Sequence, residues 1–249
     1  MRAGEKIYLT PTPVRIWHWL NALGIVTLCV TGAEIRFPEY VQVFGSYKAA
    51  VRLHNTAGIV VALSYLMWFV YYAFVARSLI KTYVPTAKDI LGGMVRQALY
   101  YFFYFFLGNK PNPHHQTPEN KFNPLQKASY MVIMFILTPL VIVTGILLMN
   151  VVPLRAIVLV IGGLKVMVAV HWLLACAFCA FLFIHIYLAT MGHTPFAHIK
   201  PMWTGWEEIE PDMYDEEAEA QPKVADETSN VLQLQKEKSP PHLKKAAGE

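Results

Sequence analysis

The sequence predicts an all-α membrane protein, a four-transmembrane-helix up-down bundle with an interfacial segment between helices 2 and 3. The 249 residues are 55% hydrophobic and 15% charged, whereas soluble domains carry about 25% charged residues. The charges are also bunched, so that four long runs contain no Asp, Glu, Lys or Arg: residues 16–33, 53–76, 128–154 and 166–199. Because each run supplies the roughly 20 apolar residues that cross a bilayer, we expect four membrane-spanning helices.

These runs place the helices at about 15–35, 53–76, 128–149 and 166–190. The first run follows three basic residues, as the core of a signal peptide does. However, it contains His18, Asn21 and two tryptophans, and no convincing small-residue cleavage site follows it. We therefore expect a retained first helix within a transmembrane domain of residues 1–206.

The basic residues predict the orientation, because cytoplasmic loops are enriched in Lys and Arg. If the N-terminus is cytoplasmic, the inner segments are 1–15, 77–127 and the tail beyond 190, and they hold 16 of the 21 basic residues. The loop 77–127 alone holds seven. Both termini are therefore expected in the cytoplasm.

Two further segments lie outside the four runs. Residues 97–109 are uncharged and rich in Tyr and Phe, but they are too few to cross a bilayer. Such aromatic density is typical of a segment lying at the membrane interface. Residues 207–249 begin with a cluster of acidic residues and continue rich in Ala, Glu, Lys and Pro. They form an acidic tail that cannot bury a core and is expected to be disordered.

Four of the nine histidines lie in or at the ends of the predicted helices. His18 is at the start of helix 1 and His54 at the start of helix 2, whereas His171 and His185 lie near the start and the end of helix 4. In an up-down bundle, His18 and His185 share the inner depth, and His54 and His171 share the outer depth. Reversing the topology exchanges the sides but keeps the pairs. Ionisable residues at membrane depth are costly and indicate function by default.

The interval between His171 and His185 defines the kind of site. Fourteen residues make about 3.9 helical turns and roughly 21 Å of rise, so both rings face nearly the same way at separate depths. Iron in a porphyrin takes axial ligands from opposite faces, and imidazole is a common ligand. Two stacked histidine pairs therefore predict two bis-histidine haems. A single zinc ion would need its ligands to converge on one point. The alternative is that each histidine is a hydrogen-bonded core or interfacial residue.

Gly58 gives weaker support, because it lies four residues after His54 on the same helix face. Its missing side chain leaves room for a flat macrocycle. Close helix packing explains a membrane glycine equally well.

The residues resemble a family, the membrane-bound di-haem cytochrome b subunits of bacterial respiratory enzymes. These include the gamma subunit of formate dehydrogenase, the b-type cytochrome of nickel-iron hydrogenase and the cytochrome b of thiosulfate reductase. The resemblance covers about residues 10–206. Four stretches carry it: Arg15-Ile-Trp-His18-Trp, His54-Asn-Thr-Ala-Gly58, Phe122-Asn-Pro-Leu-Gln-Lys127 and the pair His171 and His185.

The resemblance implies two b-type haems, an inner one held by His18 and His185 and an outer one held by His54 and His171. It also implies a quinone, menaquinone or ubiquinone, bound near the inner haem, with Asn123 and Gln126 in the matching positions. Both amides precede helix 3, on the side where His185 lies. The alternative for this pair is an ordinary polar helix start.

Two arginines are candidates for neutralising haem propionates through charge-assisted hydrogen bonds. Arg15 lies one turn before His18, and Arg52 lies two residues before His54. Either could instead be a membrane anchor or a snorkelling side chain.

Other function classes lack their signals. The sequence has no nucleotide-binding glycine motif, no nucleophile elbow and no paired catalytic carboxylates. Its net charge of +4 comes from residues that flank membrane segments rather than from a nucleic-acid patch. No catalytic residue is therefore assigned, and the catalytic centre is expected in a partner chain.

We therefore expect a multi-pass subunit of a quinone-linked oxidoreductase complex in the bacterial inner membrane. It would carry electrons between a quinone near the cytoplasmic face and a periplasmic redox subunit of iron-sulfur or multihaem cytochrome c type. Two alternatives remain at this point. One is a haem-free transporter or proton-conducting protein, and the other is a haem-containing anchor without a quinone site.

Overall fold

The computed structural model describes residues 6–108, 110, 112–114, 117, 120–192 and 194–208. Nearly all of these belong to one compact unit, Ile7–Glu207. The expected acidic tail lies outside the described residues from 209 onwards.

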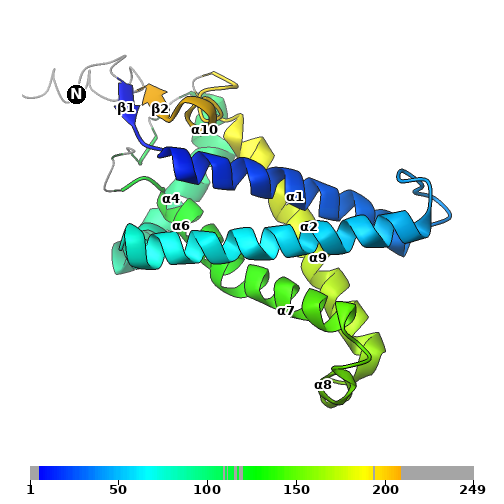
Figure 1. The fold of residues 1–249 in the computed structure, drawn as a ribbon. Helices are drawn as coiled ribbons and strands as arrows, with labels where there is room; N and C mark the ends of the chain where they lie inside the picture. Colours follow the sequence, from blue (N-terminus) through cyan, green and yellow to red (C-terminus); the bar gives the residue numbers. More distant parts are fainter. Residues whose placement is uncertain are drawn as a thin grey trace, which may run out of the picture. The chain divides into compact units, whose positions relative to one another are not determined.

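The unit is mainly helical, as Figure 1 shows. Two short strands, β1 (Lys6–Tyr8) and β2 (Trp206–Glu208), pair with each other. The elements between them are α1 (Thr12–Arg36), α2 (Tyr47–Val70), η1 (Tyr71–Val75), α3 (Leu79–Tyr83), η2 (Asp89–Gly93), α4 (Met94–Leu99), η3 (Tyr100–Tyr104), α5 (Phe105–Leu107), α6 (Pro124–Val132), η4 (Ile133–Leu137), α7 (Thr138–Met149), α8 (Arg155–Val160), α9 (Gly163–Ala189) and α10 (Pro201–Thr204). The η elements are wide, π-type turns within longer helices.

Five helical stretches in the described residues are long and apolar enough to cross a membrane: Thr12–Arg36, Tyr47–Val75, Asp89–Leu107, Pro124–Met149 and Gly163–Ala189. The all-α membrane class follows, but the predicted count of four is not confirmed. The additional stretch includes residues 97–107 of the predicted interfacial segment and extends it backwards through Arg96 to Asp89. In the sequence these charged residues interrupt the apolar run and therefore indicate a loop.

The additional stretch is attached to the start of α6. A Cβ atom on Gly93 would lie 2.9 Å from Cγ of Pro124, and Nδ2 of Asn123 donates to the hydroxyl of Tyr101 at 3.1 Å. Asp89 pairs with Lys127 at 3.6 Å. In Figure 1, α4 accordingly lies at the end of the unit where α1 begins. An interfacial position for the segment stays a prediction.

The four other long helices begin before the predicted starts. Their first turns contain or adjoin basic residues, and the prediction placed each start near the end of those charges. α2 begins at Tyr47, where Ser46 is the N-cap and its side chain accepts from the backbone N–H of Ala49 at 3.2 Å. α9 begins after Gly162, whose φ of 105° favours glycine. In α7, Pro139 follows the wide turn η4, which accommodates the missing N–H of proline.

α1 and α2 run side by side along their length (Figure 1). A buried polar contact joins them, since Nδ2 of Asn21 donates to the hydroxyl of Ser64 at 2.6 Å. The indole of Trp17 donates to the carbonyl of Ser64 at 3.1 Å. Such hydrogen bonds hold helices together where the lipid offers no hydrophobic drive for association.

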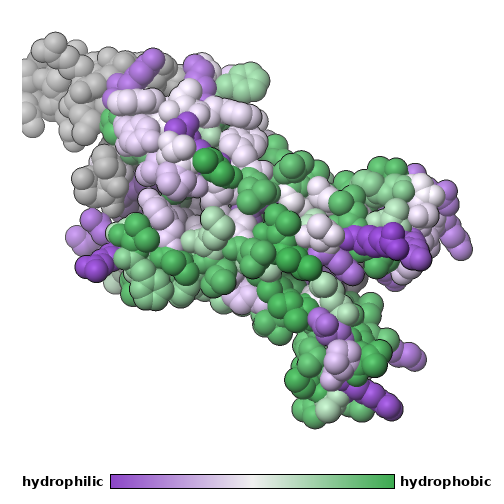
Figure 2. All heavy atoms as spheres, viewed as in Figure 1, coloured by the Kyte–Doolittle hydropathy of each residue, from purple (hydrophilic) through white to green (hydrophobic). Residues whose placement is uncertain are grey.

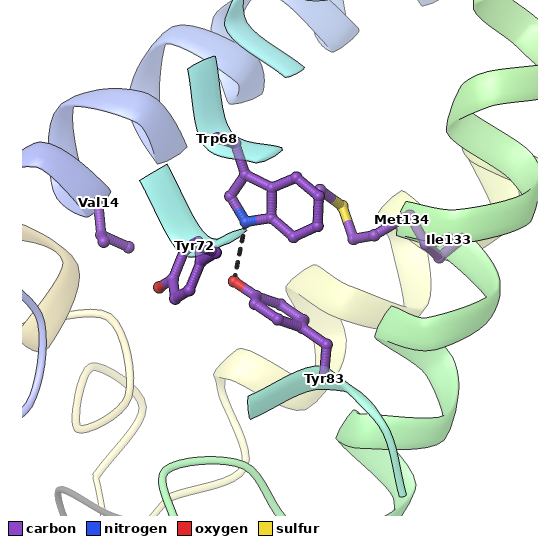
Figure 3. Packing of buried hydrophobic residues seen from close by; sticks show 6 residues of the cluster. All are labelled: Val14, Trp68, Tyr72, Tyr83, Ile133 and Met134. Carbon is purple, nitrogen blue, oxygen red and sulfur yellow. Dashed lines mark hydrogen bonds between the residues drawn. The ribbon is translucent and has the colours of Figure 1, made fainter. Parts of the chain in front are cut away.

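The hydrophobic core is largely aromatic (Figure 3). It lies at the end of the bundle where α1 begins and where η1 follows α2. Trp68 is its centre, 2% exposed, and its indole N–H donates to the hydroxyl of Tyr83 at 3.0 Å. Val14, Tyr72, Ile133 and Met134 complete the buried cluster. This core joins α1, α2, η1, α3 and η4 at one end of the bundle.

The outer surface of the bundle is apolar. In Figure 2, a hydrophobic band covers the helices between hydrophilic groups at their ends. Large side chains that stay exposed on this surface include Leu23, Leu63, Met67, Val143 and Phe183. An apolar surface of this kind is suited to lipid.

Candidate functional site

The four predicted histidines lie in two pairs at different depths of the bundle. His18 on α1 and His185 on α9 have ring centroids 6.2 Å apart, with planes at 53°. His54 on α2 and His171 on α9 have ring centroids 6.4 Å apart, with planes at 77°. The single helix α9 therefore supplies one ring to each pair.

The spacing of each pair fits one metal ion held from both sides. A metal–imidazole nitrogen bond is about 2.0 Å long, and the ring centre lies about 1.1 Å behind the nitrogen, so two rings facing each other through one metal have centres about 6.2 Å apart. Both observed distances match this value. In the described part of the chain, no three His, Cys, Asp or Glu side chains converge as a tetrahedral site requires. The residues fit the axial ligation of two haems.

Each ring of the outer pair is held at Nδ1 by a threonine. Oγ1 of Thr31 on α1 lies 2.8 Å from Nδ1 of His54. Oγ1 of Thr144 on α7 lies 2.8 Å from Nδ1 of His171. Both threonines are buried. Metal-binding histidines characteristically use the second ring nitrogen in this way.

The inner pair has a different environment. The ring of His185 stacks on Phe181, one turn earlier on α9, with centroids 5.6 Å apart. Nδ1 of His18 is buried and has no hydrogen-bond partner among the residues that the structure describes. The two pairs therefore share their spacing but not the groups that orient their rings.

Arg15, one turn before His18, is partly used by the fold. Its guanidinium donates to the carbonyl of Trp203 and to the hydroxyl of Thr12 at 2.8 Å. Its Nε is buried and has no partner within the described residues. Trp19 also donates to the carbonyl of Met202 at 2.8 Å. α10 is thus fixed over the start of α1, and the buried Nε of Arg15 remains as a donor for an anion.

Lys121 is a second cation at this end that sequence reasoning missed. Its ammonium donates to the hydroxyl of Thr10 at 2.9 Å. Burial lowers the pKa of Lys121 to about 8, although the charge of Glu207 acts in the opposite direction. A buried ammonium is costly unless an anion compensates it.

Asn123 and Gln126 form the N-terminal cap of α6. Oδ1 of Asn123 accepts from the backbone N–H of Gln126 at 2.8 Å, and Oε1 of Gln126 accepts from the backbone N–H of Asn123 at 3.0 Å. Because Nδ2 of Asn123 donates to Tyr101, three of the four polar side-chain atoms already have protein partners. This geometry matches the alternative given in the sequence analysis, an ordinary polar helix start.

The two remaining candidates have few contacts with the pairs. Arg52 is exposed on α2. A Cβ atom on Gly58 would meet only Leu28, at 3.9 Å, so this glycine faces α1. The glycines beside the histidines are others. A Cβ atom on Gly32 would lie 3.5 Å from Cε1 of His54, and one on Gly145 would lie 3.4 Å from Cε1 of His171.

Sequence comparison matches most of the chain to one family. The family described as prokaryotic cytochrome b561 matches residues 9–205. A protein of Escherichia coli (strain K12) named "Putative cytochrome YdhU" is 32% identical over 204 residues, which cover 82% of this chain and 75% of that protein.

Two hydrogenase subunits are also similar. The "Probable Ni/Fe-hydrogenase 1 B-type cytochrome subunit" of Escherichia coli (strain K12) is 32% identical over 149 residues, 55% of this chain and 58% of that protein. The "Probable Ni/Fe-hydrogenase B-type cytochrome subunit" of Rhizobium leguminosarum bv. viciae is 38% identical over 79 residues, 29% of this chain and 32% of that protein. The chain therefore spans less than two thirds of either hydrogenase subunit.

Proposed function

Because the chain belongs to the prokaryotic cytochrome b561 family and is thus a membrane electron-transfer protein with b-type haem, we propose that it holds two haems. One lies between His18 and His185, and the other between His54 and His171. The observation that carries the proposal is the spacing of the two pairs, 6.2 and 6.4 Å between ring centroids, with one ring of each on α9.

The haem iron supplies a one-electron carrier that alternates between ferrous and ferric states. The chain's own residues hold it in place and exclude water. The four imidazoles would hold the two haems, and the apolar helices around them would keep the local dielectric low, which tunes the reduction potential. We propose that the buried Nε of Arg15 binds a propionate of the inner haem and that Arg52 binds a propionate of the outer haem. Gly58 would leave room for the outer macrocycle.

We also propose a quinone, menaquinone or ubiquinone, near the inner pair, with Asn123 and Gln126 as its hydrogen-bonding groups. Their place at the start of α6 supports this, because it is the end of the bundle that holds His185. A second candidate is a haem-containing anchor without a quinone site, and the use of both amides in a helix cap favours it.

The names of the hydrogenase relatives support a complex with a catalytic partner. We propose that this partner presents an iron-sulfur or multihaem c-type subunit at the periplasmic end, beside His54 and His171. Both termini then lie in the cytoplasm, and the membrane is the bacterial inner membrane. A green fluorescent protein fused to the C-terminus is expected to fluoresce, whereas a periplasmic C-terminus would leave the fusion dark.

The test of the haem assignment is a reduced-minus-oxidised spectrum of purified protein with haem quantification. The wild type is expected to contain two b-type haems per chain. His18→Ala and His185→Ala should lose the same haem, and His54→Ala and His171→Ala the other. His198→Ala, a histidine outside both pairs, serves as the control and should keep two. Iron-free wild-type protein would contradict the proposal and favour a haem-free transporter.

A further inference from the structure

The tripeptide Val-Thr-Gly occurs twice, as residues 30–32 on α1 and residues 143–145 on α7. Each copy meets one ring of the outer pair. In both copies, the threonine hydroxyl lies 2.8 Å from Nδ1 of the histidine. In both copies, the following glycine lies against Cε1 of the same ring. Two different helices thus present the same three residues to the two rings of one site.

The threonine contacts determine which ring nitrogen carries the proton. Oγ1 of Thr31 also lies 2.7 Å from the carbonyl of Thr27, and Oγ1 of Thr144 lies 2.8 Å from the carbonyl of Leu140. A carbonyl can only accept, so the one hydroxyl proton of each threonine is donated to its own helix. Each hydroxyl oxygen therefore accepts from Nδ1–H of the histidine, and Nε2 keeps its lone pair.

The glycines act on the neighbouring edge of each ring. Cε1 lies between Nδ1 and Nε2, and a Cβ atom at either glycine would already be in van der Waals contact with it. A longer side chain at Gly32 or Gly145 would press on this edge of the ring. The motif therefore holds Nδ1 with its threonine and leaves room for the ring edge at Cε1 with its glycine.

The inner pair lacks this device at His18, whose Nδ1 has no partner in the described residues. A hydrogen bond accepted from Nδ1–H makes an imidazole a stronger electron donor. A stronger donor stabilises ferric over ferrous iron and lowers the reduction potential. The outer pair has two such bonds, one for each ring.

From these contacts we propose that Thr31 and Thr144 are positioning residues that hold His54 and His171 in one tautomer and lower the potential of the outer haem. The inference rests on the proposed ligation of that haem by His54 and His171. It adds a role for two threonines and a difference between the two sites.

The experiment is a redox titration of purified Thr31→Val and Thr144→Val proteins, with haem quantification and low-temperature electron paramagnetic resonance. At the ambient potential that half-reduces the outer haem of the wild type, the outer haem of each valine variant should have a reduced-to-oxidised ratio about tenfold higher. This ratio corresponds to a rise in reduction potential of about 59 mV for one electron. The inner haem should keep its wild-type titration. Thr31→Ser and Thr144→Ser keep a hydroxyl and should restore the wild-type potential and resonance.

Thr27→Val is the matched control, because it removes a hydroxyl from α1 that donates only to the carbonyl of Leu23. Loss of the outer haem in the valine variants but not in the serine variants would also support the proposal. An unchanged outer potential, or loss of the outer haem in the serine variants, would overturn it. An error in the proposed ligation would give a different result, because the His54→Ala protein would then keep both haems.

Discussion

A Cβ atom placed on Gly24 would lie 2.5 Å from Cγ2 of Val61. α1 and α2 therefore pack closely at a position where one of them has no side chain. Small residues allow membrane helices to approach in this way. Val61 is β-branched and rigid, so it cannot turn aside cheaply.

Gly24→Ala is expected to lower the thermal unfolding midpoint in detergent micelles, because overpacking a closely packed contact costs about 1–3 kcal/mol. Gly92→Ala is the control, since a Cβ atom there would meet no atom within 4 Å. The double variant Gly24→Ala, Val61→Ala should recover most of the loss. Equal midpoints for the two glycine variants would show that the Gly24 contact does not limit helix packing.

Tyr83→Phe is expected to destabilise the aromatic core, because it leaves the indole N–H of Trp68 buried without its acceptor. The loss should be about 1–3 kcal/mol, the cost of an unsatisfied buried polar group. The check is thermal unfolding followed by tryptophan fluorescence. Tyr40→Phe, at a side chain that is 85% exposed, should leave the midpoint unchanged. If both variants unfold like the wild type, the hydrogen bond contributes nothing measurable.

The stability of the protein should depend on pH through Lys121. Its pKa falls from 10.5 to about 8 on folding, so between these values the unfolded state binds more protons than the folded state. Stability contributed by this group therefore rises as the pH increases from about 8 to 10.5. We expect the difference in unfolding midpoint between wild type and Lys121→Met to change in that direction. A difference that stays constant over this range would contradict the assignment.

Asn123 and Gln126 can be tested as a helix cap and as quinone groups separately. Asn123→Ser keeps a capping oxygen but removes the amide, whereas Asn123→Ala removes both. If the amide binds quinone, the serine variant should keep its stability and lose quinone-dependent oxidation of the haems. If only the cap matters, oxidation by quinone should persist in the serine variant, and the alanine variant alone should be less stable, by about 1 kcal/mol.

Helical periodicity and antiparallel topology were enough to group His18 with His185 and His54 with His171. Depth along a helix follows from residue number alone, and a pair needs only equal depth and a common direction. The threonines could not be found in that way, because a threonine in a membrane helix ordinarily bonds its own preceding carbonyl. The repeated Val-Thr-Gly was the available signal, and its meaning depends on which helices are neighbours.

Charge was a poorer guide to helix ends than capping chemistry. The uncharged runs predict starts for α2 and α6 that lie after their first turns. Ser46 and Asn123 are typical N-cap residues and are visible in the sequence. The same criterion divided the stretch Asp89–Leu107. Charged residues extend into such helices wherever their side chains reach water or a partner, as Asp89 reaches Lys127.

His171 and His185 belong to one unbroken helix, so the number of residues between them fixes the spacing and relative orientation of the two histidine pairs. Inserting one residue between them would turn the second imidazole by about 100° and advance it by about 1.5 Å. Substitutions along α9 can be absorbed by neighbours, but a change in the number of residues cannot. We therefore expect this helix to tolerate substitutions at many positions but not insertions or deletions between the two histidines.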